Sequence, residues 1–212
     1  MSGMECIEIW LRNSLIQHHA TRYEAFGYLD KSTLPGISKE KHDSFVNEAL
    51  ENAARSREEF VISHRKKYSS DLHLPIWIAC ELMTMGMLLT FYKGLEVPLR
   101  SSIASGFGVS EEVFTSWLVT LYTLRNISAH HRRLWNRRFG PTMKIPRQNK
   151  HIEWHTPVRV RGDTTFGVLS VIAYLIDNID DNKAKMWRSR LDIIVESYGE
   201  DMIFEAGFPS TW

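Results

Sequence analysis

Three residues just past the middle of the chain carry the side chains that phosphodiester cleavage needs. Arg125, Asn126 and His130 lie within one R-x4-H segment. Histidine can transfer a proton near neutral pH, and arginine can hold the non-bridging oxygens of a phosphate and stabilise the charge of the transition state. In RNA the neighbouring 2′-hydroxyl can serve as the nucleophile, so no metal ion is required. The alternative is a helix end with no catalytic role, because cations often occupy the negative end of a helix dipole.

A basic segment continues from these residues. Between Arg125 and Arg161 the chain carries ten Lys or Arg and one acid, although the net charge of all 212 residues is only +1. Such a local excess favours a polyanionic partner. Its first part alternates arginines with apolar residues, as RNA-binding surfaces do when arginines hold phosphates and an exposed aromatic stacks on a base. The arginines are Arg132, Arg133, Arg137 and Arg138, which follow His131 and are interleaved with Leu134, Trp135 and Phe139. The alternative is a solvated face with Trp135 and Phe139 in the core.

The elements that must position these residues are helical nearly throughout. Apolar residues recur at three- and four-residue spacing, and Pro and Gly interrupt the pattern between segments. We therefore expect an all-α fold, a bundle of about five or six helices forming a single domain over residues 1–212, with short connections. The expected helices cover residues 5–27, 39–68, 75–95, 110 to about 130, 164 to about 179 and 183–198, and residues 103–109 are a candidate for a further short helix. Residues 140–163 contain three prolines and are expected to form a loop with at most a short strand at 158–161.

The helix that carries Arg125 has a clear start and a clear buried face. Ser110 is a good N-cap, and the acidic residues after it suit the first turn. The residues expected to face the core are Phe114, Trp117, Leu118, Leu121 and Leu124. Glu81 lies in the apolar segment 74–95 and needs a partner there. We expect it to hold Arg125 in place; the simpler reading is a buried salt bridge without a catalytic role.

Several other classes of protein are disfavoured. No glycine-rich phosphate loop is present, and His151 and His155 around Glu153 do not match the H-E-x-x-H pattern of zinc peptidases. We therefore expect no metal ion and no cofactor. The charged residues inside the longest apolar segment argue against a membrane span, and the N-terminus lacks the pattern of a signal peptide. With two cysteines and no C-x-x-C pair, the expected location is the cytoplasm.

Four blocks of the sequence carry a family resemblance. RNISAHHRRLWNRRF (125–139) resembles the signature of the Abi-like proteins, the AbiD/AbiF type of bacterial abortive-infection protein. Upstream, IEIWLRN (7–13), FVISHRKKY (60–68) and LPIWIACELMTMG (74–86) follow in that family's order. The resemblance covers roughly residues 5–139. Abi-like proteins usually carry a further helical segment before the first block, and this chain begins almost at that block, which bears on regulation more than on the Arg/His chemistry.

The resemblance implies a fold, an activity and partners. Abi-like proteins are placed in the HEPN superfamily of all-α proteins, many of which are metal-independent ribonucleases with an R-x4–6-H motif that maps here onto Arg125 and His130. Asn126 takes the place of the polar residue usual after that arginine. The resemblance implies a homodimer that cleaves RNA at the interface between its subunits. It also implies a role in phage defence, or as a toxin that is restrained by an RNA or protein antitoxin. The alternatives are a non-catalytic module that binds a structured or antitoxin RNA, and a structural dimer that binds an acidic protein.

Overall fold

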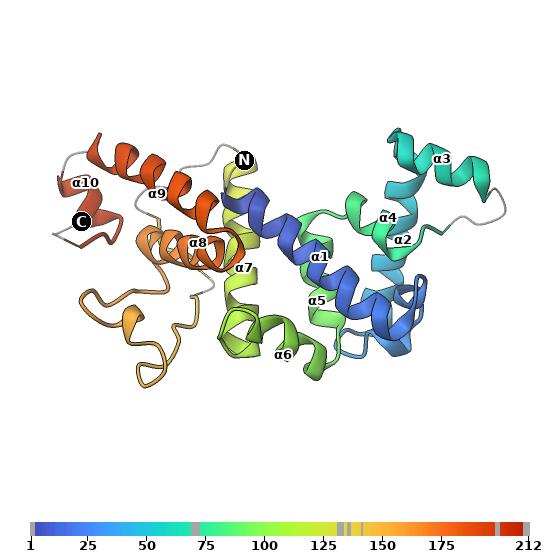
Figure 1. The fold of residues 1–212 in the computed structure, drawn as a ribbon, viewed down its shortest axis with the longest axis horizontal. Helices are drawn as coiled ribbons and strands as arrows, with labels where there is room; N and C mark the ends of the chain where they lie inside the picture. Colours follow the sequence, from blue (N-terminus) through green and yellow to red (C-terminus); the bar gives the residue numbers. More distant parts are fainter. Residues whose placement is uncertain are drawn as a thin grey trace. The chain divides into compact units, whose positions relative to one another are not determined.

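The computed structural model describes residues 3–68, 73–130, 134, 137–140, 142–197 and 200–209. In these residues the chain forms ten α-helices and no β-strand (Figure 1), which confirms the predicted all-α class. The helices are α1 (Gly3–Tyr23), α2 (Lys39–Arg55), α3 (Glu59–Lys67), α4 (Ile76–Ala79), α5 (Met85–Gly94), α6 (Val97–Ser105), α7 (Glu111–Ala129), α8 (Thr165–Ile179), α9 (Asp181–Glu196) and α10 (Glu200–Glu205). They outnumber the five or six expected, because two segments expected as single helices are broken and because α6 and α10 are additional helices.

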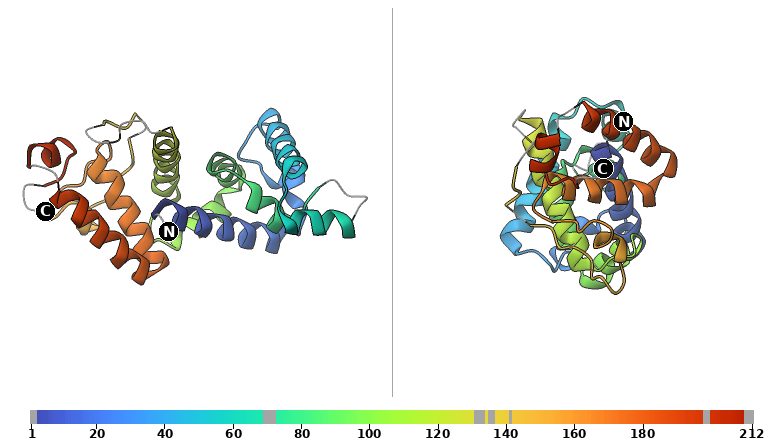
Figure 2. Two further views of the ribbon diagram at one scale, coloured as in Figure 1. Left: turned by 90° about the horizontal axis from the view of Figure 1, so that it is seen from above. Right: turned by 90° about the vertical axis from the view of Figure 1, so that its left-hand side faces the viewer.

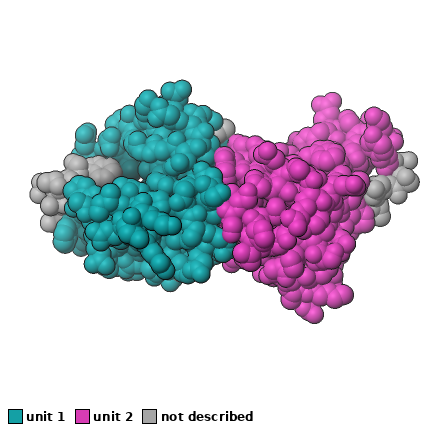
Figure 3. Space-filling view, turned by 60° about the horizontal axis from the view of Figure 1, so that its bottom comes forward, with its two compact units in different colours: residues 1–8, 104–212 teal, residues 9–103 magenta. Residues whose placement is uncertain are grey.

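The chain divides into two compact units (Figure 3). One unit contains residues 1–8 and 104–212, and the other contains residues 9–103. The chain passes from one unit to the other inside α1 and again inside α6. The unit that contains α7 holds the R-x4-H segment and the basic segment after it, together with the first residues of α1.

In the unit of residues 9–103, the helix expected over 39–68 ends early. Ser56 has an extended backbone (φ −66°, ψ 133°), and its hydroxyl accepts a hydrogen bond from the backbone N–H of Glu58 at 3.2 Å. This local side-chain hydrogen bond competes with the helical pattern, so α2 ends at Arg55 and α3 begins at Glu59. The expectation of one continuous helix was wrong here.

The helix expected over 75–95 is broken in the same way. A short 3-10 turn covers Cys80–Leu82, and Thr84 has an extended backbone (φ −71°, ψ 163°). The Thr84 hydroxyl accepts from the backbone N–H of Met87 at 3.3 Å and so acts as the N-cap of α5. Glu81 therefore lies on a turn between α4 and α5, where it is exposed, and not on a buried helix face.

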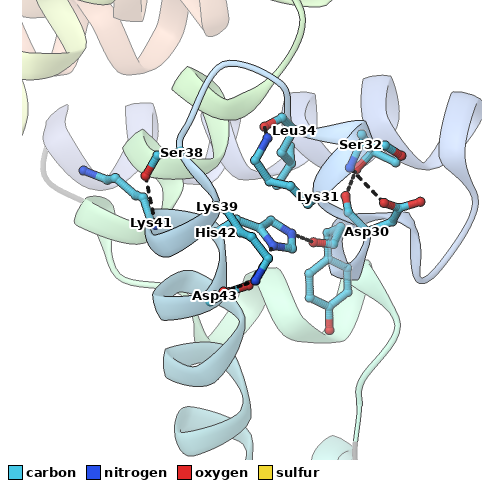
Figure 4. Close-up of polar contacts among 11 residues, drawn as sticks. Asp30, Lys31, Ser32, Leu34, Ser38, Lys39, Lys41, His42 and Asp43 are labelled. Atoms are coloured by element: carbon cyan, nitrogen blue, oxygen red, sulfur yellow. Dashed lines mark hydrogen bonds and ion pairs between the residues drawn. The ribbon is translucent and has the colours of Figure 1, made fainter.

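The start of α2 shows how the loop before it is attached (Figure 4). Ser38 is the N-cap, and its hydroxyl accepts from the backbone N–H of Lys41 at 3.3 Å. His42, in the first turn, is buried and lies with Nε2 3.1 Å from the backbone oxygen of Tyr28. These contacts join α2 to the preceding turns of the same unit.

In the other unit, α8 and α9 pack along one another (Figure 1 and Figure 2), and α7 contacts α8. The predicted cap at Ser110 is present, and α8 begins with a cap of the same kind. The Ser110 hydroxyl accepts from the N–H of Val113 at 3.4 Å at the start of α7, and the Thr164 hydroxyl accepts from the N–H of Gly167 at 3.1 Å at the start of α8. The buried residues of α7 include all five predicted to face the core.

The described part of residues 140–163 is a loop that contains one 3-10 turn, Ile152–Trp154, and no strand. It is held against α7 and α8 by aromatic residues. The indole N–H of Trp117 donates to the backbone oxygen of Lys144 at 3.0 Å, and the rings of Trp117 and Trp154 lie 5.3 Å apart. Trp154 in turn packs on Tyr174, with ring centroids 5.3 Å apart. The loop is thus attached to the helix that carries the candidate site.

Candidate functional site

The R-x4-H segment forms the C-terminal end of α7. Leu124 and Ile127 are buried, so the helix turns Arg125 outward, and 45% of the Arg125 side chain is exposed. Asn126 is half-buried, and His130 is exposed as the first residue after α7. The backbone N–H of His130 donates to the backbone oxygen of Asn126 at 3.2 Å. His130 therefore directly follows the last turn of α7, and Arg125 directly precedes that turn.

The side chains of this segment are available to an external ligand. Within the described residues, the side chains of Asn126 and His130 have no hydrogen-bond or ion-pair partner. Arg125 has one ion pair, in which its Nε atom lies 3.9 Å from Oε1 of Glu8 on α1. The structure thus brings the three predicted residues to one exposed helix end and adds an acid that was not predicted.

The ion pairs of Glu81 and Arg125 differ from the one expected. Oε2 of Glu81 lies 3.4 Å from Nη1 of Arg12, and 49% of the Glu81 side chain is exposed. The Nε atom of Arg12 also donates to the backbone oxygen of Cys80 at 2.8 Å. The physical reason is the break between α4 and α5, which takes Glu81 out of an apolar helix and puts it on a turn. Glu81 and Arg125 each have another partner, and they belong to different units.

The basic segment after α7 is described in part. His131, Arg132, Arg133 and Trp135 lie outside the described residues, so their roles remain predictions. Arg137 is exposed and has no ion pair among the described residues. Phe139 is buried, so this aromatic belongs to the core and cannot stack on a base.

Arg138 is already partly neutralised within the chain. Its Nη1 atom lies 2.7 Å from Oδ2 of Asp163, and the same oxygen lies 3.1 Å from Nη2 of Arg161. Although partial burial acts in the opposite direction, these two guanidinium groups lower the pKa of the Asp163 carboxyl. Arg138 therefore links the segment after α7 to the start of α8, and Arg137 is the better candidate for contact with a phosphate.

The histidines of the H-x-E-x-H segment hold the loop in place. Nε2 of His151 lies 3.0 Å from the backbone oxygen of Gly108, and its Nδ1 lies 3.0 Å from Oε1 of Glu153. Nε2 of His155 lies 2.8 Å from the backbone oxygen of Pro146. Among the residues that the structure describes, no cluster of His, Cys, Asp or Glu has the arrangement of a metal site.

Two features of the site were missed in the sequence. Glu8 lies between two isoleucines in the sequence, as Glu81 lies in an apolar segment, but nothing in the spacing connects Glu8 to Arg125. Lys150 and Arg159 belong to the basic segment and are exposed without an ion pair in the described part of the chain. Only the structure shows which cations of that segment are neutralised internally.

A model of the Abi-like protein family matches residues 1–136, which is more than half of the chain. The chain belongs to the Abi-like family. The matched region runs from α1 to just past α7, so it includes Glu8, Arg125, Asn126 and His130 of this Abi-like protein. The resemblance drawn from the four sequence blocks is therefore confirmed, and family membership points to a role in abortive infection.

No curated protein and no solved structure matches this Abi-like protein significantly. Among its described helices, none combines the length and the apolar character needed to cross a membrane.

Proposed function

We propose that this Abi-like protein is a metal-independent endoribonuclease of the HEPN type that acts in abortive infection or as a toxin. One observation carries the proposal. Arg125, Asn126 and His130 lie together at the exposed end of α7, and the hydrogen-bonding groups of their side chains have no hydrogen-bond partner in the described part of the chain. The buried face of α7 fixes their position, and their chemistry suits a phosphodiester.

The reaction would use the RNA itself as the nucleophile. Arg125 binds the non-bridging oxygens of the scissile phosphate and stabilises the charge that develops on them. The 2′-oxygen forms a bond to phosphorus and the bond from phosphorus to the 5′-oxygen breaks. His130 accepts the proton of the 2′-hydroxyl or donates a proton to the departing 5′-oxygen. The products are a 2′,3′-cyclic phosphate and a 5′-hydroxyl, and Asn126 orients the phosphate or His130.

We further propose that two copies of the chain form the complete site. The reaction needs both a base and an acid, and each copy contributes one His130. Two copies with their α7 ends in one cleft would supply both proton transfers and two guanidinium groups. Arg132, Arg133, Arg137 and Arg138 would then follow the RNA backbone on either side. An RNA or protein antitoxin would act by covering this cleft.

The test is cleavage of labelled single-stranded and structured RNA in the presence of EDTA. We expect the wild type to cleave, and Arg125→Ala and His130→Ala each to lower the rate at least about 100-fold, because each removes a group used in the transition state. Arg55→Ala is a matched control, because Arg55 is an arginine of the other unit and 78% of its side chain is exposed. Circular dichroism would show that all variants remain folded.

Full activity of both Arg125→Ala and His130→Ala would contradict the proposal. If the wild type binds RNA tightly but does not cleave it, and His130→Ala binds equally well, the chain is instead a module that sequesters RNA. Product analysis gives a second check, because the mechanism requires a 2′,3′-cyclic phosphate and the use of a metal-activated water would not produce it.

A further inference from the structure

The packing of the first residues of α1 fixes the position of Glu8 beside Arg125. Cys6 and Ile7, just before it, are 5% and 1% exposed. Gly3, one helical turn and a half earlier, packs so closely on α8 and α9 that a Cβ atom there would lie 2.7 Å from the Trp187 indole nitrogen and 2.8 Å from Ile176. The start of α1 is therefore fixed to the unit that contains α7, and only 23% of the Glu8 side chain is exposed.

The geometry of the contact leaves the donors of Arg125 unused. The closest approach, between Nε of Arg125 and Oε1 of Glu8, is 3.9 Å, which is an ion pair but is too long for a hydrogen bond. A guanidinium has five N–H donors. Among the described residues none of these donors is hydrogen-bonded. The carboxylate thus attracts the guanidinium without occupying the N–H groups that would bind a phosphate.

We propose that Glu8 is a positioning residue for Arg125, an inference that rests on the proposed ribonuclease function. An arginine on a helix surface has many rotamers, and most of them direct the guanidinium away from a substrate bound at the helix end. The fixed carboxylate of Glu8 on the Nε side restricts these rotamers and directs Nη1 and Nη2 outward. Two parallel N–H groups can then bind two phosphate oxygens. Glu8 itself does not touch the reacting atoms.

The test is the kinetics of RNA cleavage by Glu8→Ala and Glu8→Gln. We expect Glu8→Ala to lower kcat by about 10-fold with KM changed less than about 2-fold, because a misplaced catalytic group affects the transition state more than binding. Glu8→Gln keeps an oxygen at the same place but loses the charge, so its kcat should be intermediate. Glu51→Ala is the matched control, because it removes an exposed ion pair with Arg55 in the other unit and should leave kcat unchanged.

Two outcomes would overturn the inference while the ribonuclease function stands. Glu8→Ala could cleave at the wild-type rate, or it could cleave faster and bind RNA more tightly, which would make Glu8 a competitor of the phosphate. A further readout separates positioning from a general structural role. In an Arg125→Lys background, which lacks Nε, Glu8→Ala should cause no additional loss of kcat, whereas damage to the fold would add to the loss.

A measurement without RNA keeps the inference testable if the chain proves inactive. The urea unfolding midpoints of the wild type, Glu8→Ala, Arg125→Ala and the double variant form a double-mutant cycle. Non-additive shifts would support the Glu8–Arg125 contact even if the proposed function failed. Additive shifts would overturn the inference whatever the result of the cleavage assay.

Discussion

The buried histidine of α1 predicts a strong loss of stability in mild acid. His19 is 0% exposed, and its Nε2 lies 3.2 Å from Oγ1 of Thr33. The Thr33 hydroxyl lies 2.8 Å from the backbone oxygen of Gly27 and 2.9 Å from that of Asp30, so its single proton is donated to these carbonyls. It must therefore accept from His19, which places the imidazole proton on Nε2. In the described part of the chain the buried Nδ1 has no hydrogen-bond partner, and protonation there would bury a cation whose new N–H has no acceptor.

The lowered pKa of His19 determines how much unfolding free energy is lost and whether it is lost in acid or in base. Burial lowers the pKa of His19 from 6.5 to about 4. Between these two values the unfolded chain binds a proton that the folded chain does not, so stability falls as the pH falls and is fully present above pH 6.5. The resulting loss of unfolding free energy from this one residue is about 2 kcal/mol at pH 5 and about 3 kcal/mol at pH 4.

The assay compares wild type and His19→Gln by urea unfolding at pH 7, 6 and 5. Glutamine can still donate to Thr33 but does not titrate, so the wild type should lose roughly 2 kcal/mol more than the variant between pH 7 and pH 5. An NMR titration of the His19 ring gives the pKa directly. Equal losses in the two proteins, or a His19 resonance that titrates near pH 6.5, would refute the reasoning.

Two further predictions concern the packing of a loop and the RNA-binding surface. Gly36→Ala should lower the free energy of unfolding, measured in urea, by about 2 kcal/mol or more. A Cβ atom at this position would lie 2.2 Å from the backbone oxygen of Lys93, and the Gly36 N–H donates to the backbone oxygen of Gly94, which fixes the loop. Unchanged stability would show that this loop can move away. Arg137→Ala should reduce the magnitude of the slope of log affinity for single-stranded RNA against log salt concentration by about 0.7. Arg138→Ala should reduce this slope by a smaller amount, because Arg138 is already ion-paired with Asp163. Equal reductions in the two variants would contradict this difference.

The parts of the fold that were predictable are those with strong local signals. The start of α7 at Ser110, its buried face and the cap at Thr164 all follow from residues close together in the sequence. The two helix breaks were missed because Ser56 and Thr84 can either continue a helix or bond to a nearby backbone N–H. The choice between these alternatives depends on packing that the sequence pattern does not contain.

The candidate site shows the same limit at longer range. That a cation such as Arg125 pairs with an acid could be expected, but both Glu8 and Glu81 are acids among apolar residues and equally plausible partners. Two facts of packing distinguish Glu8 from Glu81 as the partner of Arg125. Glu81 lies on a turn beside Arg12, whereas the first turns of α1 belong to the same unit as α7. Local periodicity therefore predicts which groups could do the chemistry, and only contacts between distant segments show which acid lies beside Arg125.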